Sequence, residues 1–174
     1  MRLATALNEC VLRPWVPADK ASLVANANNH RVWRNLADVF PHPYTDADAD
    51  QWFRIANSPG RSINFAIEVD GVAVGGIGAR AGEGIFVRTA QFGYWLGESF
   101  WGRGIMTAAG RVMLEHLRQD ARFARLEAPV FEWNPASMRV LDKIGFVREA
   151  VRRNSVTKDG QLIDSVLYTY LIKP

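Results

Sequence analysis

The sequence predicts a single α+β domain with a mixed, mostly antiparallel central sheet of about six to seven strands flanked by helices. Three observations favour this class. Short apolar segments with strand periodicity alternate irregularly with amphipathic helical segments, rather than in a regular strand–helix repeat. Asp70-Gly71 is a strong signal for a hairpin between neighbouring strands. The 174 residues contain no linker, repeat or low-complexity tract, so we expect one domain over 1–174.

Proline, glycine and capping residues divide the first half of the chain. Pro41 and Pro43 exclude a continuous helix, and Thr45 or Asp46 caps the helix that follows. The second strand of the Asp70-Gly71 hairpin carries glycines, which indicate a thin strand or a bulge. The predicted elements are a strand at 11–15, a helix at 19–28, a helical or turn segment at 30–36, a helix at 46–56, and hairpin strands at 63–69 and 72–79.

The second half alternates strands with two amphipathic helices. An apolar stripe predicts a helix from Gly104 to about Asp120. Asn134 is a good N-cap for the next helix, and Gly145 ends it. The remaining elements are a loop at 82–88 and strands at 91–96, 126–131, 146–156 and 163–171.

Composition is that of a globular protein, with 48% hydrophobic and 22% charged residues. A single cysteine, Cys10, excludes an internal disulfide framework and a cysteine-based metal site. No apolar run reaches the ~18 residues needed to span a membrane, and the N-terminus lacks the apolar region of a secretion signal. We therefore expect a cytoplasmic protein without a metal. Nucleic-acid binding is the weakest option at net charge +3, because no recognised motif is present.

The turn between the strand at 91–96 and the helix from Gly104 suits a phosphate group. Gly102 and Gly104 bracket Arg103, and glycine lets the backbone approach a ligand closely. The first amides of a helix lack intrahelical partners, and the helix dipole is positive there. Arg103 adds a full positive charge. The alternative is that the two glycines only shape a tight connection.

Two ordered segments resemble the GCN5-related N-acetyltransferases (GNAT), and more closely their RimJ/RimL-like branch of ribosomal-protein N-terminal acetyltransferases. The first runs from Gly93 to Thr107 and the second from Asn134 to Phe146. Arg13-Pro14-Trp15 and the segment from Phe40 to Thr45 are also similar to the opening of that branch. The resemblance therefore covers nearly the whole chain.

This resemblance implies the GNAT fold, acetyl-CoA as cosubstrate and a primary amine as acceptor. It also implies that the strands at 91–96 and 126–131 splay apart, which exposes the backbone of Trp95 and Leu96 to the pantetheine arm. Asn134 and Ser137 would contact the pantetheine region. The turn that would bind the pyrophosphate consists of Trp101, Gly102, Arg103, Gly104, Ile105, Met106 and Thr107.

The catalytic groups are less sharply defined. The resemblance implies direct attack by the amine in a ternary complex, with Ser137 as the acid for the departing thiolate. The alternative for Ser137 is a first-turn helix residue that bonds the backbone. Many family members carry a tyrosine where Leu141 stands. Glu132 is our first choice for the base, and Glu98 and Glu83 are alternatives; each also fits a solvated surface carboxylate.

The sequence leaves the identity of the acceptor amine open. Trp33 and Trp52 lie in the segment that covers the acceptor in this family, so we expect them to bind substrate. The acceptor is a protein N-terminal amine or a small-molecule amine. A third alternative is a non-catalytic acyl-CoA-binding domain, because the tyrosine is missing and the base is unassigned. A homodimer would use the final strand or the loop at 82–89.

Overall fold

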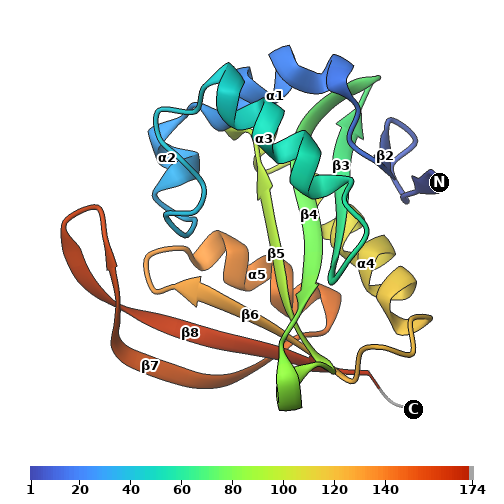
Figure 1. The fold of residues 1–174 in the computed structure, drawn as a ribbon. Helices are drawn as coiled ribbons and strands as arrows, with labels where there is room; N and C mark the ends of the chain where they lie inside the picture. The colour runs from blue at the N-terminus through green and yellow to red at the C-terminus, as the bar shows by residue number, and fades with distance from the viewer. Residues whose placement is uncertain (173–174) are drawn as a thin grey trace.

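An eight-stranded sheet with the order β1-β2-β3-β4-β5-β6-β8-β7 forms the centre of the protein (Figure 1). The computed structural model describes residues 1–172. Every neighbouring pair is antiparallel except β5 and β6, which run parallel. The strands are β1 (Leu3–Ala4), β2 (Cys10–Arg13), β3 (Ser62–Val69), β4 (Val72–Ala81), β5 (Thr89–Leu96), β6 (Arg125–Phe131), β7 (Val147–Lys158) and β8 (Gln161–Leu171). The predicted fold class is confirmed, and β1 is the strand that the sequence analysis did not anticipate.

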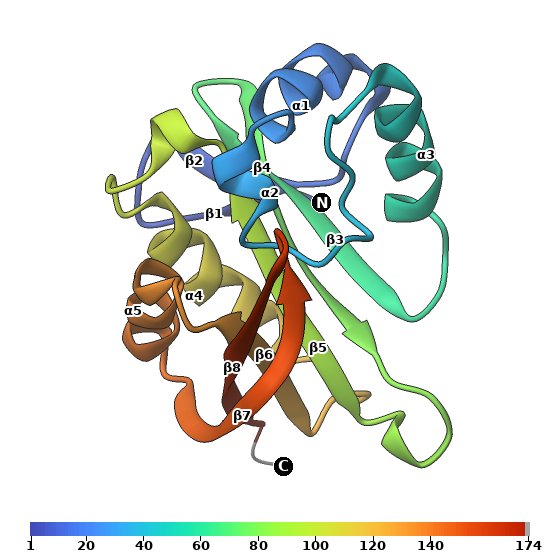
Figure 2. The same cartoon turned by 90° about the vertical axis from the view of Figure 1, so that its left-hand side faces the viewer.

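Helices cover both faces of the sheet (Figures 1 and 2). Alternate residues of β3 point to opposite faces: Phe65 and Ile67 belong to the buried cluster under α4 and α5, whereas Ala66 belongs to the cluster under α1 and α3. The helices are α1 (Lys20–Ala27), α2 (His30–Trp33), α3 (Asp46–Ala56), α4 (Ile105–Arg118) and α5 (Pro135–Ile144), with short 3₁₀ turns η1 (Pro17–Asp19), η2 (Gly84–Phe86) and η3 (Glu98–Phe100). None of the helices in residues 1–172 is long and apolar enough to cross a membrane.

The local signals form the predicted caps and turns. The Thr45 hydroxyl accepts from the Asp48 amide at the start of α3, and the Asn134 side chain accepts from the Ser137 amide at the start of α5. Asp70 and Gly71 both have positive φ, as a two-residue hairpin turn of this hand requires. The glycines of β4 allow close approach of β5, since a Cβ at Gly75 would collide with the Trp95 carbonyl oxygen.

The sheet divides between β5 and β6. These strands pair over three residues only, from Thr89–Arg125 to Gln91–Glu127. Beyond that point β5 continues its pairing with β4 up to Leu96, while β6 continues with β8 up to Phe131. The facing edges of the two strands therefore separate, which confirms the predicted splay (Figure 1).

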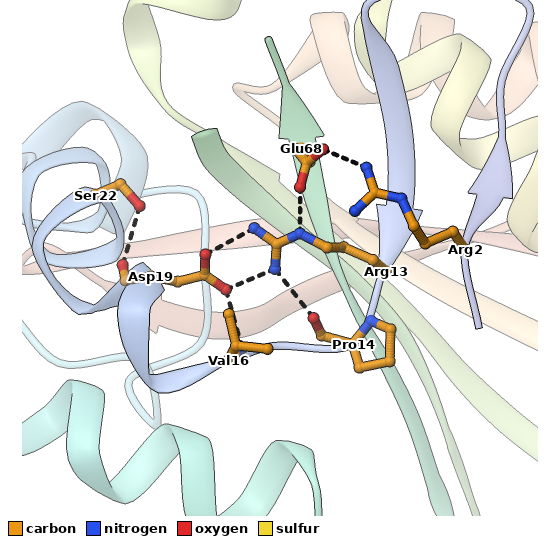
Figure 3. A network of polar contacts seen from close by, with 7 residues as sticks. All are labelled: Arg2, Arg13, Pro14, Val16, Asp19, Ser22 and Glu68. Atoms are coloured by element: carbon orange, nitrogen blue, oxygen red, sulfur yellow. Dashed lines mark hydrogen bonds and ion pairs between the residues drawn. The ribbon is translucent and has the colours of Figure 1, made fainter. Parts of the chain in front are cut away.

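A buried ion network fastens β2 to η1 and β3 (Figure 3). Arg13 donates to both carboxylate oxygens of Asp19 at 2.7 Å, and its Nε donates to Glu68. Arg2 reaches the other oxygen of Glu68 at 2.5 Å. Burial alone would raise the pKa of Glu68, but the hydrogen bonds from Arg13 and Arg2 outweigh it and lower the pKa. The three buried charges satisfy one another.

Candidate functional site

The turn before α4 is an open, left-handed stretch of backbone. Gly102 has φ +75° and Gly104, the N-cap of α4, has φ +77°. A Cβ at either position would meet nothing within 4 Å, so backbone conformation and not packing requires glycine there. No side chain of the described residues caps α4, and the turn is exposed from Trp101 to Gly104. The Trp101 amide donates to the Glu98 carbonyl at 3.1 Å, and the amides that follow it are accessible to an anion, as is Arg103.

Of the two residues expected to present their backbone, Leu96 borders the gap and Trp95 does not. The Trp95 carbonyl lies against Gly75 of β4, and the Gly97 amide donates to the Val74 carbonyl at 2.8 Å across the same ladder. Because successive residues of a strand direct their backbone groups to opposite sides, those of Leu96 face away from β4, toward the gap. The Leu96 carbonyl accepts from the Trp101 indole at 2.7 Å, which fixes the ring beside the gap.

Ser137 meets a residue that the sequence analysis missed. Its hydroxyl lies 2.8 Å from the Tyr94 hydroxyl, and the Tyr94 hydroxyl also lies within donating distance, 3.2 Å, of the Ser137 carbonyl. The Ser137 hydroxyl thus contacts another side chain and does not bond the backbone of its own helix. Burial raises the pKa of Tyr94 to about 12, although the Ser137 hydrogen bond acts to lower it.

The three candidate carboxylates all hold partners. Oε1 of Glu132 accepts from the Asp164 amide at 3.0 Å, at the end of the β6–β8 ladder. Glu98 accepts from the Asn29 side chain at 2.8 Å and pairs with Arg31, and Glu83 pairs with Arg61. Within residues 1–172, Oε2 of Glu132 takes no hydrogen bond, so this exposed carboxylate keeps one oxygen available.

Helix α2 contacts both sides of the gap. Arg31 pairs with Glu98 of η3 and lies 5.7 Å from the centroid of the Trp101 ring, on the β5 side. Arg34, just past α2, lies 4.5 Å from the centroid of the Trp133 ring, which follows β6. These contacts hold α2 over the opening between the two separated strands.

The two expected substrate-binding tryptophans have different surroundings. Trp33 of α2 stacks on His42 at 5.5 Å, and the buried Lys158 ammonium lies 3.4 Å from the Trp33 ring centroid. Trp52 of α3 packs edge-on against Trp15 at 6.2 Å, at the margin of the apolar cluster under α1 and α3. Trp33 therefore lies beside the gap under the tip of the β7–β8 hairpin, and Trp52 lies away from it, partly buried against the apolar cluster.

A groove of about 790 Å³ lies over the stretch in which β5 and β6 pair. It runs along the sheet face opposite α4 and α5, because Gln91 and Glu127 alternate with the buried residues of that other face. Charges of both signs line it. The charged lining residues are Arg80, Glu83, Arg125, Glu127, Glu149 and Arg152.

Comparison with known proteins gives consistent matches. The model of a family described as acetyltransferase (GNAT) domain matches residues 10–147. The probable N-acetyltransferase YjcK of Bacillus subtilis is 39% identical over 74 residues, which are 42% of this chain and 41% of that protein. The chain spans less than half the length of the curated relatives it matches.

Solved structures match over nearly the full length. RimJ of Mycobacterium smegmatis, in complex with CoA-disulfide, is 27% identical with a TM-score of 0.83, covering 98% of this chain and 86% of that one. RimL, a ribosomal L7/L12 α-N-protein acetyltransferase in complex with coenzyme A, has a TM-score of 0.86 at 20% identity, covering 99% and 98%. The second likeness is one of fold.

Proposed function

The chain belongs to the GNAT acetyltransferase family, and from this we propose that it transfers the acetyl group of acetyl-CoA to a primary amine. The observation that carries the proposal is the gap between β5 and β6, which opens beside the uncapped N-terminus of α4. A donor in this gap would place its phosphates on the turn and its thioester between the strands. Both contacts need only backbone groups that the fold leaves free.

The proposed donor site uses the turn and the edge of β5. The amides from Gly102 to Thr107 would hold the pyrophosphate, helped by the charge of Arg103. The positions where Cβ atoms would stand at Gly102 and Gly104 are empty, so a phosphate can reach the backbone. Pantetheine would follow the gap-facing backbone of Leu96, with Asn134 and Ser137 opposite.

In the proposed reaction, the amine attacks the thioester carbonyl directly. An alkyl ammonium must first lose a proton, and we assign this step to Glu132 through its available Oε2, directly or by way of a water. Ser137 would donate a hydrogen bond to the departing sulfur. A backbone amide facing the gap, that of Leu96, would stabilise the negative charge on the carbonyl oxygen.

The groove on the opposite sheet face favours a polypeptide N-terminus as the acceptor. Its volume of about 790 Å³ and its charges of both signs suit several residues of an extended chain. A small cationic amine is the second candidate, because the exposed carboxylate of Glu132 would attract its positive charge.

Thermal unfolding with and without acetyl-CoA tests the donor assignment. Because a ligand that binds only the folded state stabilises it by mass action, the unfolding midpoint should rise. Release of coenzyme A would then be measured with two panels, peptides with free N-termini and small amines. No shift at millimolar acetyl-CoA would sink the proposal, and binding without turnover on either panel would favour a non-catalytic acyl-CoA-binding domain.

A further inference from the structure

A contact between two hydroxyl groups joins β5 to α5 beside the gap. Tyr94 lies on β5 and Ser137 in the first turn of α5, 43 residues later, and their oxygens are 2.8 Å apart. Both side chains are partly buried. Tyr94 is held in place by an edge-on contact with the Phe92 ring at 5.9 Å, and Ser137 by the Asn134 cap. These contacts hold the two hydroxyl oxygens close together, while the hydroxyl hydrogens can still rotate.

We propose that Tyr94 is a positioning residue for acetyl transfer, which directs the hydroxyl proton of Ser137 toward the departing sulfur. The inference rests on the proposed function and assigns a role to a residue for which the sequence predicted none. Tyr94 acts through Ser137, and Ser137 alone meets the leaving group. The arrangement supplies a tyrosine hydroxyl from β5, whereas the position at which many family members carry one is Leu141.

The number of hydroxyl protons limits which contacts the pair can form. Each hydroxyl has one proton to donate. If Tyr94 donates to the Ser137 carbonyl at 3.2 Å, the 2.8 Å contact must be filled by the proton of Ser137, which then points away from the gap. If Tyr94 donates to the Ser137 oxygen, the serine proton is released for the sulfur. Rotation of one phenol hydrogen therefore switches Ser137 between two states.

Acetyl transfer leaves both hydroxyl groups chemically unchanged. The nitrogen–carbon bond forms, the carbon–sulfur bond breaks, and sulfur departs with the electron pair. The proton that the amine loses to the base and solvent is balanced by the one that the thiolate later gains. Ser137 donates a hydrogen bond to the negative charge as it develops, Tyr94 donates one to Ser137, and neither gives up its proton. Because burial raises the pKa of Tyr94 to about 12, its hydroxyl stays protonated and can donate at neutral pH.

The test combines Tyr94→Phe, Ser137→Ala and the double variant, assayed with an amine that the wild-type protein acetylates. We expect Tyr94→Phe to lower kcat about tenfold, the value of one hydrogen bond, and to leave the KM for acetyl-CoA within about twofold. In the Ser137→Ala background it should have no further effect. Ultraviolet titration of bound coenzyme A should show a raised thiol pKa in Tyr94→Phe, since the thiolate loses an oriented donor.

Tyr170→Phe is the matched control. Tyr170 packs against the Phe146 ring at 5.6 Å, beside the same apolar cluster. Loss of its hydroxyl should leave kcat, KM and the thiol pKa of bound coenzyme A unchanged. The proposal is overturned if Tyr94→Phe behaves like this control, or if its effect adds to that of Ser137→Ala and follows a fall in the unfolding midpoint. A wild-type protein that acetylates no amine would refute the proposed function, and the thiol titration would still decide the role of Tyr94.

Discussion

The need for glycine at Gly104 comes from backbone conformation alone. The residue has φ +77°, a Cβ atom there would meet nothing within 4 Å, and the helix it begins has no side-chain cap among the described residues. A substitution therefore acts in two separable ways. It strains the backbone by about 1–2 kcal/mol, and it changes what an anion meets at the turn.

Gly104→Asp should weaken acetyl-CoA binding about tenfold or more, because a carboxylate would stand beside the pyrophosphate. The measurement is a titration of each variant with acetyl-CoA. Gly84→Asp is the matched control: Gly84 has φ +55°, is equally open, and lies before β5 at the end remote from the turn. Equal loss of affinity in both variants would show that strain and not charge is responsible, and would contradict the donor site.

Single residues were predictable where the signal is local. Glycine at positive φ and Asn or Thr at a helix start act within a few positions, and the structure places Gly102, Gly104, Thr45 and Asn134 accordingly. Tyr94 was not predictable in this way, because its partner lies 43 residues away and no spacing rule links a strand residue to a distant helix turn. The roles of Glu132 and Ser137 stay predictions.

Among the strands, β7 combines the greatest exposure with one buried charge at its end. Most residues of β7 are exposed, yet Lys158 at its end is 3% exposed and lies between the Trp33 ring and Asp38. Asp159, in the turn, also contacts His30 at 3.2 Å. The hairpin tip is thereby fastened to α2, beside the gap (Figure 2).

Lys158→Met should release this tip. The loss of a buried ammonium on an aromatic face costs about 2 kcal/mol, while Asp38 stays solvated because its side chain is 73% exposed. Hydrogen exchange of the amides from 156 to 162 should become faster. Arg153→Met, an exposed change on the same strand, should leave exchange unchanged. If these amides exchanged as slowly in Lys158→Met as in the wild type, the hydrogen bonds between β7 and β8 alone would hold the tip.

Element types and order followed from the sequence, because hydrophobic period, proline and glycine are properties of short segments. The docking of the hairpin tip did not follow. Lys158 and Asp38 are 120 residues apart. In the sequence, Lys158 next to Asp159-Gly160 indicates an ordinary turn, and only the fold brings Trp33 against the lysine. The splay of β5 from β6 came from the family resemblance and not from periodicity.

For the whole molecule, the network around Arg13 contributes to the response to acid. The pKa of Glu68 is lowered in the folded protein from its ordinary value of 4.5. A carboxylate with a lowered folded pKa adds stability above its unfolded pKa and loses it as the pH falls through the folded value. Folding stability should therefore decline as the pH drops below about 4.5.

Glu68→Gln should reduce the free energy of unfolding at neutral pH by about 1–3 kcal/mol, because hydrogen bonds to a charged group are lost. Its stability should fall less than that of the wild type below pH 4.5, so that the two curves converge. Denaturant unfolding across this pH range is the measurement. Glu115→Gln, at an exposed surface pair, should reproduce the wild-type curve. Parallel curves for Glu68→Gln would contradict the assignment.

The strand order has a consequence for how the chain can be cut. β1 to β5 lie on one side of the gap and β6 to β8 on the other, and each set is continuous in sequence. The chain passes between them once, through residues 97–124. A break between Arg118 and Arg125 yields two consecutive fragments whose shared boundary is the proposed donor site. Binding of acetyl-CoA by such a pair would report that the fragments have met, which makes the protein a natural template for a split reporter.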